Sequence, residues 1–234
     1  MIVAIPYAGN ALDLAVLLTQ LQMQEVLPTS IYLADNSKDG SGVMIAERYH
    51  WKVPIATQRN AGGIHQSWNA AIRYAKEEDV VIVNDDIMIS RDFVSVMSAY
   101  MKSGEAAMYC PANAGFPPAG KIRKGYTWSN DNNLEYYFLD HEQYVLPPSI
   151  TGWCMGLPHE TIESIGIFDE NLTLYFGDKD YEKRIFTAGK RACFIKGLFV
   201  QHFGSSSTRR IKKKNHNKIY KHDEAIYKKK WGIV

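Results

Sequence analysis

Two adjacent carboxylates, Asp85 and Asp86, follow directly after the apolar run Val80–Val83. An unbroken run of mostly β-branched residues is typical of a strand that is buried on both faces of a parallel sheet. Acidic side chains at the carboxyl end of such a strand lie where open α/β sheets bind their ligands. Carboxylate oxygens are ligands that Mg²⁺ and Mn²⁺ prefer, so the pair indicates a metal site. An ordinary turn is the alternative, because Asn84 and the two acids are also good turn residues.

The elements that would position these carboxylates alternate as strand, loop and helix through the first 90 residues. Apolar runs at residues 2–6, 30–34, 53–56 and 80–83 predict strands, and loops with Asp, Asn or Gly follow them. This alternation is the pattern of a doubly wound sheet with a ligand crevice at the carboxyl ends of its strands. Helical periodicity predicts helices at residues 12–24 and 43–49, and a third whose apolar face carries Ile64, Trp68, Ala71, Ile72 and Ala75.

The second half of the chain is less regular. A helix at residues 91–101 and a strand at 106–109 precede a stretch, residues 111–148, that is rich in Gly, Pro, Asn and aromatic residues. Such a long irregular stretch in a compact domain is usually a functional loop, although residues 136–139 fit a strand. Its aromatic rings suit sugar faces and ordinary packing equally well. Further helices are expected at 158–165 and 181–188, and strands at 191–195 and 198–201.

Size and composition predict one domain in a reducing compartment. The chain has 234 residues, 46% of them hydrophobic, which suffices for one large domain with at most a small appendage. No window approaches 18 consecutive apolar residues, so no transmembrane segment is expected. The first residues have the pattern of a strand and not of a signal peptide. Cys110, Cys154 and Cys193 match neither a disulfide framework nor a zinc site, which favours a cytoplasmic location.

Charge is unevenly distributed along the chain. The net charge is +2, yet residues 209–230 contain ten Lys or Arg and only two acids, which leaves a net charge of −6 for the rest. A mildly acidic body therefore carries a basic C-terminal tail, residues 209–234. The spacing of five apolar residues in this tail would allow a helix to pack against the body. These residues are Ile219, Tyr220, Ile226, Tyr227 and Trp231.

In their order along the chain, these segments resemble glycosyltransferase family 2. Each motif is weak alone, but their common order over most of the chain is a strong signal. The residues that carry the resemblance are Ile5-Pro6-Tyr7, Asp35-Asn36-Ser37 with Asp39-Gly40-Ser41, Asn60-Ala61-Gly62-Gly63 with Asn69, Val83-Asn84-Asp85-Asp86-Ile87, Gly166-Ile167-Phe168-Asp169-Glu170, Asp178-x-Asp180 with Arg184, and His202 with Gly204-Ser205-Ser206.

The resemblance implies the GT-A fold, a Rossmann-like, doubly wound mixed α/β sheet flanked by helices. It implies a single domain over residues 1–208, with a nucleotide-sugar-binding half at 1–105 and an acceptor and catalytic half at 106–208, followed by the basic tail. The implied activity is metal-dependent, inverting transfer of one hexosyl or pentosyl group. The donor is a nucleoside-diphosphate sugar, the acceptor a hydroxyl of a glycan, a lipid-linked glycan or a protein glycan, and the cofactor Mn²⁺ or Mg²⁺.

On the donor side, the resemblance places the metal at Asp86, because the family's last D-x-D carboxylate bridges metal and diphosphate. His202 is the second expected ligand, and Asp85 lies nearer the ribose or a metal-bound water. Asp35 is expected to accept from the base or ribose and Tyr7 to stack on the base, with turn formation as the alternative for Asp35. A plain helix-entry turn is the alternative for the glycine loop. The expected nucleotide contacts are Pro6, Tyr7, Asp35, Asn60, Gly62, Gly63, Asn69 and Asp85.

On the acceptor side, the resemblance makes Asp178 the general base that an inverting transfer needs opposite the leaving group. The family usually has Glu-Asp at this point, whereas this chain has Gly177 before the base, so the preceding acid is absent. Asp180 is the rival base, but it lies four residues before Arg184, and a salt bridge fits it better. Trp153 and Asp180 are also expected to contact the acceptor.

Two features of the processive polysaccharide synthases of this family, a Q-x-x-R-W segment and transmembrane helices, do not occur in the sequence. The expected enzyme is therefore soluble, non-processive and cytoplasmic. Residues 209–230 are expected to contact an anionic membrane peripherally, or to close over the donor diphosphate. The alternative function is a nucleic-acid or anionic-membrane binding protein on a nucleotide-binding fold, and nucleic acid is the less favoured of these partners.

Overall fold

The computed structural model describes residues 1–111, 126–129, 136–139, 152–195, 198, 200–203 and 213–233. The strands are β1 (Ile2–Tyr7), β2 (Ser30–Asp35), β3 (Ile55–Arg59), β4 (Val80–Val83), β5 (Ile87–Ile89), β6 (Met108–Pro111), β7 (Tyr126–Ser129), β8 (Tyr136–Leu139), β9 (Cys154–Leu157), β10 (Ala192–Ile195) and β11 (Val200–His202). The helices are α1 (Ala11–Gln22), α2 (Ser41–Arg48), α3 (Ile64–Ala75), α4 (Phe93–Ser103), α5 (His159–Ile165), α6 (Gly177–Thr187) and α7 (Lys213–Trp231).

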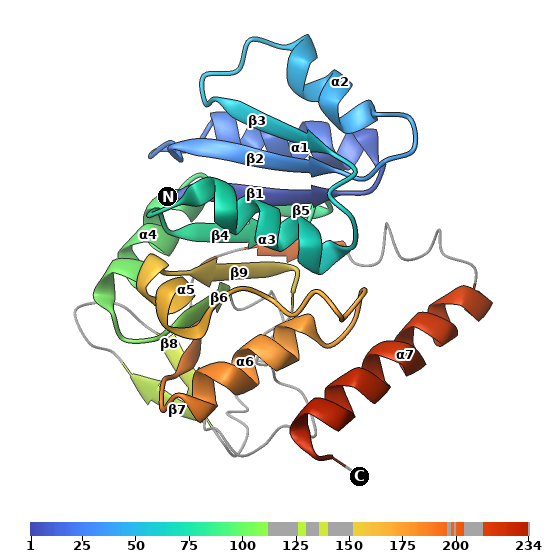
Figure 1. Cartoon of the computed structure of the whole chain (residues 1–234). Coiled ribbons are helices and arrows are strands. Elements are labelled where there is room, and N and C mark those ends of the chain that lie inside the picture. The colour runs from blue at the N-terminus through green and yellow to red at the C-terminus, as the bar shows by residue number, and fades with distance from the viewer. Residues whose placement is uncertain are drawn as a thin grey trace.

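Nine of the strands form one mixed sheet in the order β3-β2-β1-β4-β9-β6-β10-β8-β7 (Figure 1). The first four strands in this order are parallel to one another, and β9 runs antiparallel between β4 and β6. Every residue of β4 is fully buried, as the unbroken apolar run predicts. Its side chains alternate between the two faces, with Val81 and Val83 in one core and Val80 and Ile82 in the other.

Helices cover both faces of the sheet, so the predicted doubly wound GT-A architecture is confirmed. Leucines of α1 and apolar residues of α4 fill the core on one face. Apolar residues of α3, α5 and α6 pack on the other face, which is the nearer one in Figure 1. Because successive strands and helices wind this way, the loops after β1, β2 and β4 meet at one edge of the sheet.

A second, two-stranded sheet extends this edge. β5 resumes the apolar pattern directly after the acidic residues that follow β4, and β11 pairs with it antiparallel. The pairing joins a segment near residue 88 to one near residue 201, more than a hundred positions later in the sequence. A residue from the last part of the chain therefore lies beside the end of β4.

The C-terminal helices differ from expectation at one boundary. α6 begins at Gly177, not near residue 181, because Phe176 adopts a left-handed conformation (φ +66°) that turns the chain sharply into the helix. Asp178 therefore lies in the first turn of α6. The basic tail contains the 19-residue helix α7, whose aromatic residues contact the body as predicted, while one end of the helix extends beyond it (Figure 1).

The structure describes part of residues 106–208, where the acceptor half is expected. β8 spans residues 136–139 as predicted, and it pairs with both β7 and β10. The rest of residues 111–148 after Pro111, the Gly204-Ser205-Ser206 motif and residues 209–212 of the tail lie outside the described residues. Across the described residues, every helix is too short or too polar to span a bilayer.

Candidate functional site

Asp85 and Asp86 follow the carboxyl end of β4 and lie inside the protein, with 4% and 3% of their surfaces exposed. The Oδ2 atom of Asp85 is buried and has no hydrogen-bond partner among the described residues. Burial, the neighbouring Asp86 carboxylate and that of Asp13 raise the pKa of Asp85 to about 7. A buried carboxylate oxygen without a partner is costly unless a ligand supplies the missing interaction. The end of β4 thus holds one acidic group, Asp85, that the described chain satisfies only in part.

The small sheet brings His202 to Asp86. β11 pairs with β5 so that His202 lies opposite Ile87, the residue after Asp86. The imidazole Nε2 lies 3.1 Å from Oδ1 of Asp86. The ring of Trp153 stacks on the imidazole, with centroids 5.4 Å apart and planes inclined by 14°. The backbone oxygen of Trp153 also accepts from the N–H of Asn84 at 2.8 Å, so this residue contacts the cluster in two ways.

This cluster suits a divalent cation that a bound substrate helps to coordinate. Asp86 and His202 supply one carboxylate and one imidazole, and Asp85 has a buried oxygen with unused acceptor capacity. Mg²⁺ and Mn²⁺ are commonly bound by one or two protein groups and complete their shell with phosphate and water oxygens. Within the described ranges, no three His, Cys, Asp or Glu side chains converge as a complete site. The protein groups therefore fit an ion that substrate oxygens complete.

Asp35, at the end of β2, is fully buried and accepts hydrogen bonds at both oxygens. Oδ1 accepts from the N–H and Oγ of Ser37 at 2.8 and 2.5 Å. Oδ2 accepts from the N–H of Val43 at 2.9 Å and from Nη1 of Arg59 at 3.0 Å. Burial alone raises the pKa of Asp35, but these bonds outweigh it and hold the pKa below its ordinary value. With 36% of its side chain exposed, Arg59 is the member of this ion pair that a nucleotide can reach more readily.

Tyr7 is buried beneath the start of α2. Its hydroxyl shares a hydrogen bond with Oγ of Ser41 at 2.9 Å. A Cβ at Gly42 would lie 2.6 Å from Cδ1 of Tyr7 and 2.8 Å from Cγ of Asp35, so glycine permits α2 to pack this closely. The expected stacking of Tyr7 on a base is not available in this arrangement, because the ring is covered. Of Pro6 and Tyr7, Pro6 is the residue that is partly exposed at the surface.

The loop after β3 brings backbone close to Asp35. Asn60 and Gly62 both have positive φ, +54° and +100°, and the N–H of Asn60 donates to the backbone oxygen of Asp35 at 2.9 Å. The N–H of Gly63 donates to Oε1 of Gln66 at 2.5 Å, which closes the entry to α3. The loop therefore serves as a helix entry, and it also lies beside the end of β2, where nucleotide contact is expected.

Asn69 does not join these groups. It is fully buried in α3, and its amide nitrogen donates to the backbone oxygen of Phe168 at 2.9 Å and to Oε1 of Glu170 at 2.8 Å. Its amide oxygen accepts from the N–H of Phe168 at 2.8 Å. Both ends of the amide are thus used to hold residues 168–170 against α3. Two motifs of the resemblance are therefore bonded to each other, and we do not retain Asn69 as a donor contact.

Asp178 is linked to the pair Asp86 and His202 through two consecutive residues, 152 and 153. Its Oδ2 accepts from the N–H of Gly152 at 2.9 Å, and its Oδ1 from the N–H of Lys179 at 2.9 Å. Gly152 precedes Trp153, the residue whose ring stacks on His202. A Cβ at residue 152 would lie 2.7 Å from a tryptophan ring of α3, so glycine permits this close approach. The candidate base and the candidate metal ligands therefore share one short segment.

Asp180 is fully buried and surrounded by donors. Its Oδ2 accepts from Nε of Arg184 at 3.1 Å, so the salt bridge that the spacing predicts is confirmed. Two residues of α7 add to it, because Nζ of Lys230 lies 2.8 Å from Oδ1 and Nε1 of Trp231 donates to Oδ1 at 2.9 Å. These contacts anchor α7 to α6, which leaves Asp180 poorly placed to act on an acceptor.

The sequence did not single out Arg59, His65, Gly152 or Asp223, although each has a polar contact at or near the site. Two of them carry a signal that could have been used. Arg59 directly precedes the glycine loop, and Asp223 is one of only two acids in the basic tail. The roles of His65 and Gly152 follow only from their tertiary contacts.

One protein-family model matches the sequence. The family model described as glycosyl transferase family 2 matches residues 2–166. A search of curated protein sequences found no match.

Solved structures share the fold at low sequence identity. A mannosyltransferase from Pyrobaculum calidifontis in complex with GDP-Man and Mn²⁺ has a TM-score of 0.64 and 17% identity, over 86% of this chain and 56% of its own. S. aureus TarS in complex with UDP-GlcNAc has a TM-score of 0.61 and 14% identity, over 90% and 61%. GalNAc-T7 with UDP, GalNAc and Mn²⁺ has a TM-score of 0.63 and 13% identity, over 86% and 42%. This chain thus spans about half the length of these proteins.

Proposed function

Since the chain belongs to glycosyl transferase family 2, we propose that it transfers one sugar, with inversion and with a divalent metal, from a nucleoside-diphosphate sugar to a hydroxyl acceptor. The observation that carries this proposal is the link between Asp178 and the Asp86–His202 pair through residues 152 and 153. The link supports the proposal because it connects a carboxylate that can take a proton with groups that can hold a metal–diphosphate complex.

On the donor side, Asp86 and His202 would hold the ion, and Asp85 would contact the ribose or a water of the ion. When bound, Mn²⁺ or Mg²⁺ supplies Lewis-acid stabilisation of the departing diphosphate. The backbone of Asn60, Gly62 and Gly63, with Pro6, lines the nucleotide. Asp35 is fully buried and holds Arg59 at the end of β3, and Arg59 contacts the base. The solved relatives that carry GDP-Man, UDP-GlcNAc or UDP support a nucleotide-sugar donor of this class.

On the acceptor side, Asp178 accepts the proton of the attacking hydroxyl. Its hydrogen bond from Gly152 fixes one carboxylate oxygen, and the other oxygen lies at the start of α6. Trp153 lies between this base and His202, and its ring contacts the acceptor sugar.

A thermal-shift screen of nucleoside diphosphates, with and without Mn²⁺, tests the proposal. A ligand that binds only the native state raises the melting temperature, by an amount set by its concentration relative to Kd. We expect one of UDP, GDP or dTDP to raise it only when Mn²⁺ is present, and Asp86→Ala to remove that shift. An equal shift by all nucleotides without metal would contradict the proposed donor site.

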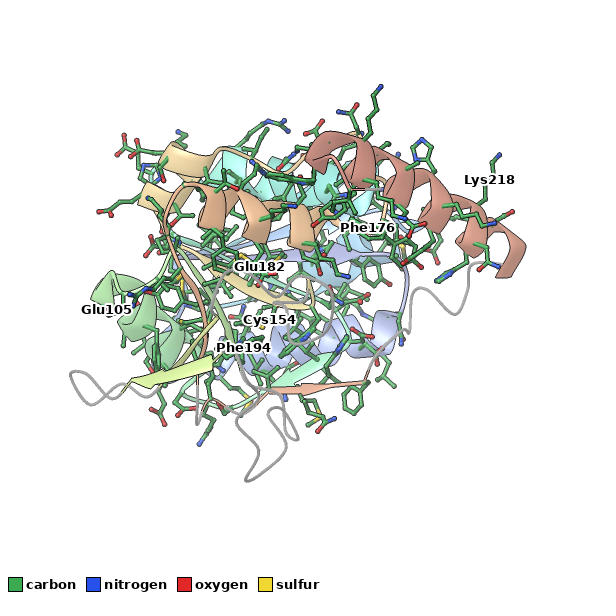
Figure 2. The ribbon with its side chains drawn as sticks, turned by 90° about the horizontal axis from the view of Figure 1, so that it is seen from below. Glu105, Cys154, Phe176, Glu182, Phe194 and Lys218 are labelled. Atoms are coloured by element: carbon green, nitrogen blue, oxygen red, sulfur yellow. The ribbon has the colours of Figure 1, made fainter. Side chains whose placement is uncertain are left out.

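We also propose that the outer face of α7 contacts an anionic membrane near a lipid-linked acceptor. Lys218, Lys221, Lys228 and Lys229 are exposed on this helix, and Lys218 lies on the end that extends away from the body (Figure 2). Clustered lysines near a bilayer each contribute about 1 kcal/mol of attraction to anionic lipid. The opposite face of α7 is occupied by its contacts with the body.

Vesicle flotation tests this contact. The full chain is expected to float with phosphatidylglycerol vesicles at low salt, to stay behind with phosphatidylcholine, and to detach as salt rises. Replacing the four exposed lysines by glutamine should abolish flotation. Tight, salt-dependent binding to duplex DNA without any binding to anionic vesicles would instead favour the nucleic-acid alternative.

A further inference from the structure

Residues 172–177, which we call the strap, lead into α6 and lie directly before Asp178. On the α3 side the strap is held by His65, a histidine with 1% of its surface exposed. Nδ1 of His65 lies 2.7 Å from the backbone oxygen of Leu172, so Nδ1 carries the ring proton and donates it. At the other end of the strap, a Cβ at Gly177 would lie 2.0 Å from Nε2 of the same ring. One imidazole therefore contacts both ends of the strap.

On the α7 side the strap is held by Asp223, which is fully buried. Its Oδ1 accepts from the N–H of Thr173 at 3.0 Å, and its Oδ2 accepts from those of Leu174 and Tyr175 at 2.8 Å each. Burial alone raises the pKa of Asp223, but these hydrogen bonds outweigh it and hold the pKa below its ordinary value. Three consecutive backbone donors thus depend on one carboxylate from a helix about fifty residues later in the chain.

Aromatic contacts with α7 also hold the last residues of the strap, at the turn before α6. Phe176 has the left-handed backbone conformation that starts the helix, and its ring stacks on Tyr227 of α7, with centroids 5.2 Å apart and planes inclined by 27°. Phe176 lies between α6 and α7 in Figure 2. Two residues further on, Asp178 begins its contact with Gly152. The place of Asp178 therefore depends on contacts to the strap from both sides.

We propose that His65 and Asp223 are positioning residues that together set the location of the Asp178 carboxylate, so that α7 completes the acceptor half of the site. This inference rests on the proposed function, in which Asp178 is the base. The hydrogen bonds of both residues go to the backbone of the strap, so both are expected to affect kcat more than nucleotide affinity. α7 lies outside residues 2–166, the part that the family model matches, so this support is supplied by the chain's own C-terminal helix.

The test replaces Asp223 by asparagine, which keeps the shape but leaves one acceptor oxygen and an NH₂ group that faces a backbone N–H. A base displaced by about 1 Å can lower turnover by about 10²-fold, so we expect kcat to fall by about 10- to 100-fold. KM for the donor should change much less than kcat, because the strap meets the donor side only through the backbone of Thr173, which lies beside Gly63 in the described structure. The assay uses Mn²⁺ with UDP- and GDP-sugars, and Glu224→Gln, on the same helix, is the matched control that should leave both constants unchanged.

Gly177→Ala disturbs the strap from the opposite side, because its Cβ must displace His65 while Asp223 stays in place. It should lower kcat in the same way as Asp223→Asn. Hydrogen exchange is measured in parallel, and the amides of Thr173, Leu174 and Tyr175 should lose protection in Asp223→Asn but not in the control. Normal kcat in Asp223→Asn would overturn the proposal, as would an equal loss of nucleotide affinity or unchanged protection of the three amides.

The outcomes separate this inference from the function on which it rests. If the wild-type protein transfers no sugar and binds no nucleoside diphosphate, the proposed function fails, while hydrogen exchange still shows whether Asp223 holds the strap. If the wild type is active and Asp223→Asn is equally active, only the positioning role fails. Loss of kcat together with loss of amide protection and with normal nucleotide binding supports both.

Discussion

Asp85 and Asp223 are both buried carboxylates, but they differ in how many hydrogen-bond donors the described chain supplies to them. Asp223 accepts three backbone hydrogen bonds and one from His222, and its pKa is held below the ordinary value. Asp85 has a buried oxygen without a partner in the described chain and lies beside Asp86, and its pKa is raised to about 7. Burial is common to both residues, so it cannot be what distinguishes a structural carboxylate from a functional one.

What distinguishes them is whether the fold supplies the donors. At Asp223, Asp180 and Asp35, donors from two or more elements converge on each carboxylate, so these groups join segments that are distant in sequence. At Asp85 the donors are incomplete, and the nearest charges are repulsive. A buried charge that the protein itself does not compensate can be stabilised by a bound ligand. Buried acids with a strongly shifted pKa therefore mark candidate binding sites. The four predictions that follow measure this contrast.

The largest expected effect is on catalysis at Asp86. Asp86→Ala removes the carboxylate that contacts His202, so metal-dependent transfer should become undetectable, consistent with a metal contribution of several kcal/mol. The measurement is product formation over a Mn²⁺ titration, with circular dichroism to verify that the fold is kept. Full activity of this variant at saturating Mn²⁺ would show that the acids after β4 are a polar turn.

The next effect concerns the base. Asp178→Asn should lower kcat by about 10²–10⁴-fold, because proton transfer from the acceptor loses its carboxylate. The thermal shift by nucleoside diphosphate with Mn²⁺ should be unchanged, since Asp178 contacts Gly152 and Lys179 and not the donor-side groups. A variant that binds nucleotide normally and turns over normally would remove Asp178 from the mechanism.

A smaller effect is expected on stability at Asp180. Asp180→Asn leaves Arg184 and Lys230 without their buried counter-charge, which should lower the free energy of unfolding by about 3 kcal/mol. kcat measured well below the melting temperature should fall by less than about fivefold, far less than for Asp178→Asn. Lys228→Ala, which removes only an exposed pair with Glu224 at 3.7 Å, is the control and should change stability by less than about 1 kcal/mol.

If Asp180→Asn instead abolished turnover at normal stability, the two acids of α6 would exchange roles. Asp180 would then be the base, and Asp178 would serve mainly to anchor Gly152. The denaturant midpoint and kcat of the two variants, measured side by side, decide between these assignments.

The sequence predicted those parts of the fold that depend on local pattern. The apolar run at residues 80–83 gave both ends of β4 correctly, since a strand buried on both faces leaves a continuous signal. The aromatic spacing in the tail predicted the docked face of α7. The salt bridge from Asp180 to Arg184 followed from helical spacing alone. In each of these cases the information lies within a few residues.

The parts that were missed depend on partners far away in the chain. The contact of His65 with Leu172 spans 107 positions, and that of Asp223 with Thr173 spans 50, so no local pattern reports them. Tyr7 was expected to stack on a base because its type and position allow it, but Gly42 lets α2 cover the ring. The early start of α6 was missed because its first residues, Gly177-Asp178-Lys179-Asp180, carry no apolar period.

The smallest expected effect is the dependence of stability on pH, measured in a chelator so that no metal is bound. For Asp35 and Asp223 the folded pKa is below the unfolded one, so the stability they contribute is present above the ordinary carboxyl pKa and is lost as pH falls through the folded pKa. For Asp85 the folded pKa of about 7 lies above the unfolded one, so the folded state binds more protons and stability falls as pH rises toward 7.

The melting temperature should therefore be highest near the ordinary carboxyl pKa and decline on both sides of it, by several degrees on the Asp85 side. Asp85→Asn should remove the decline toward pH 7 that Asp85 causes, because the variant has no ionisable group at residue 85, and it should melt higher than the wild type at pH 8. Asp223→Asn should flatten the acid limb and melt lower at every pH above it. If Asp85→Asn kept the wild-type slope toward pH 7, the contrast between an unsatisfied and a satisfied carboxylate would not hold, since the chain would be stabilising Asp85 as fully as it stabilises Asp223.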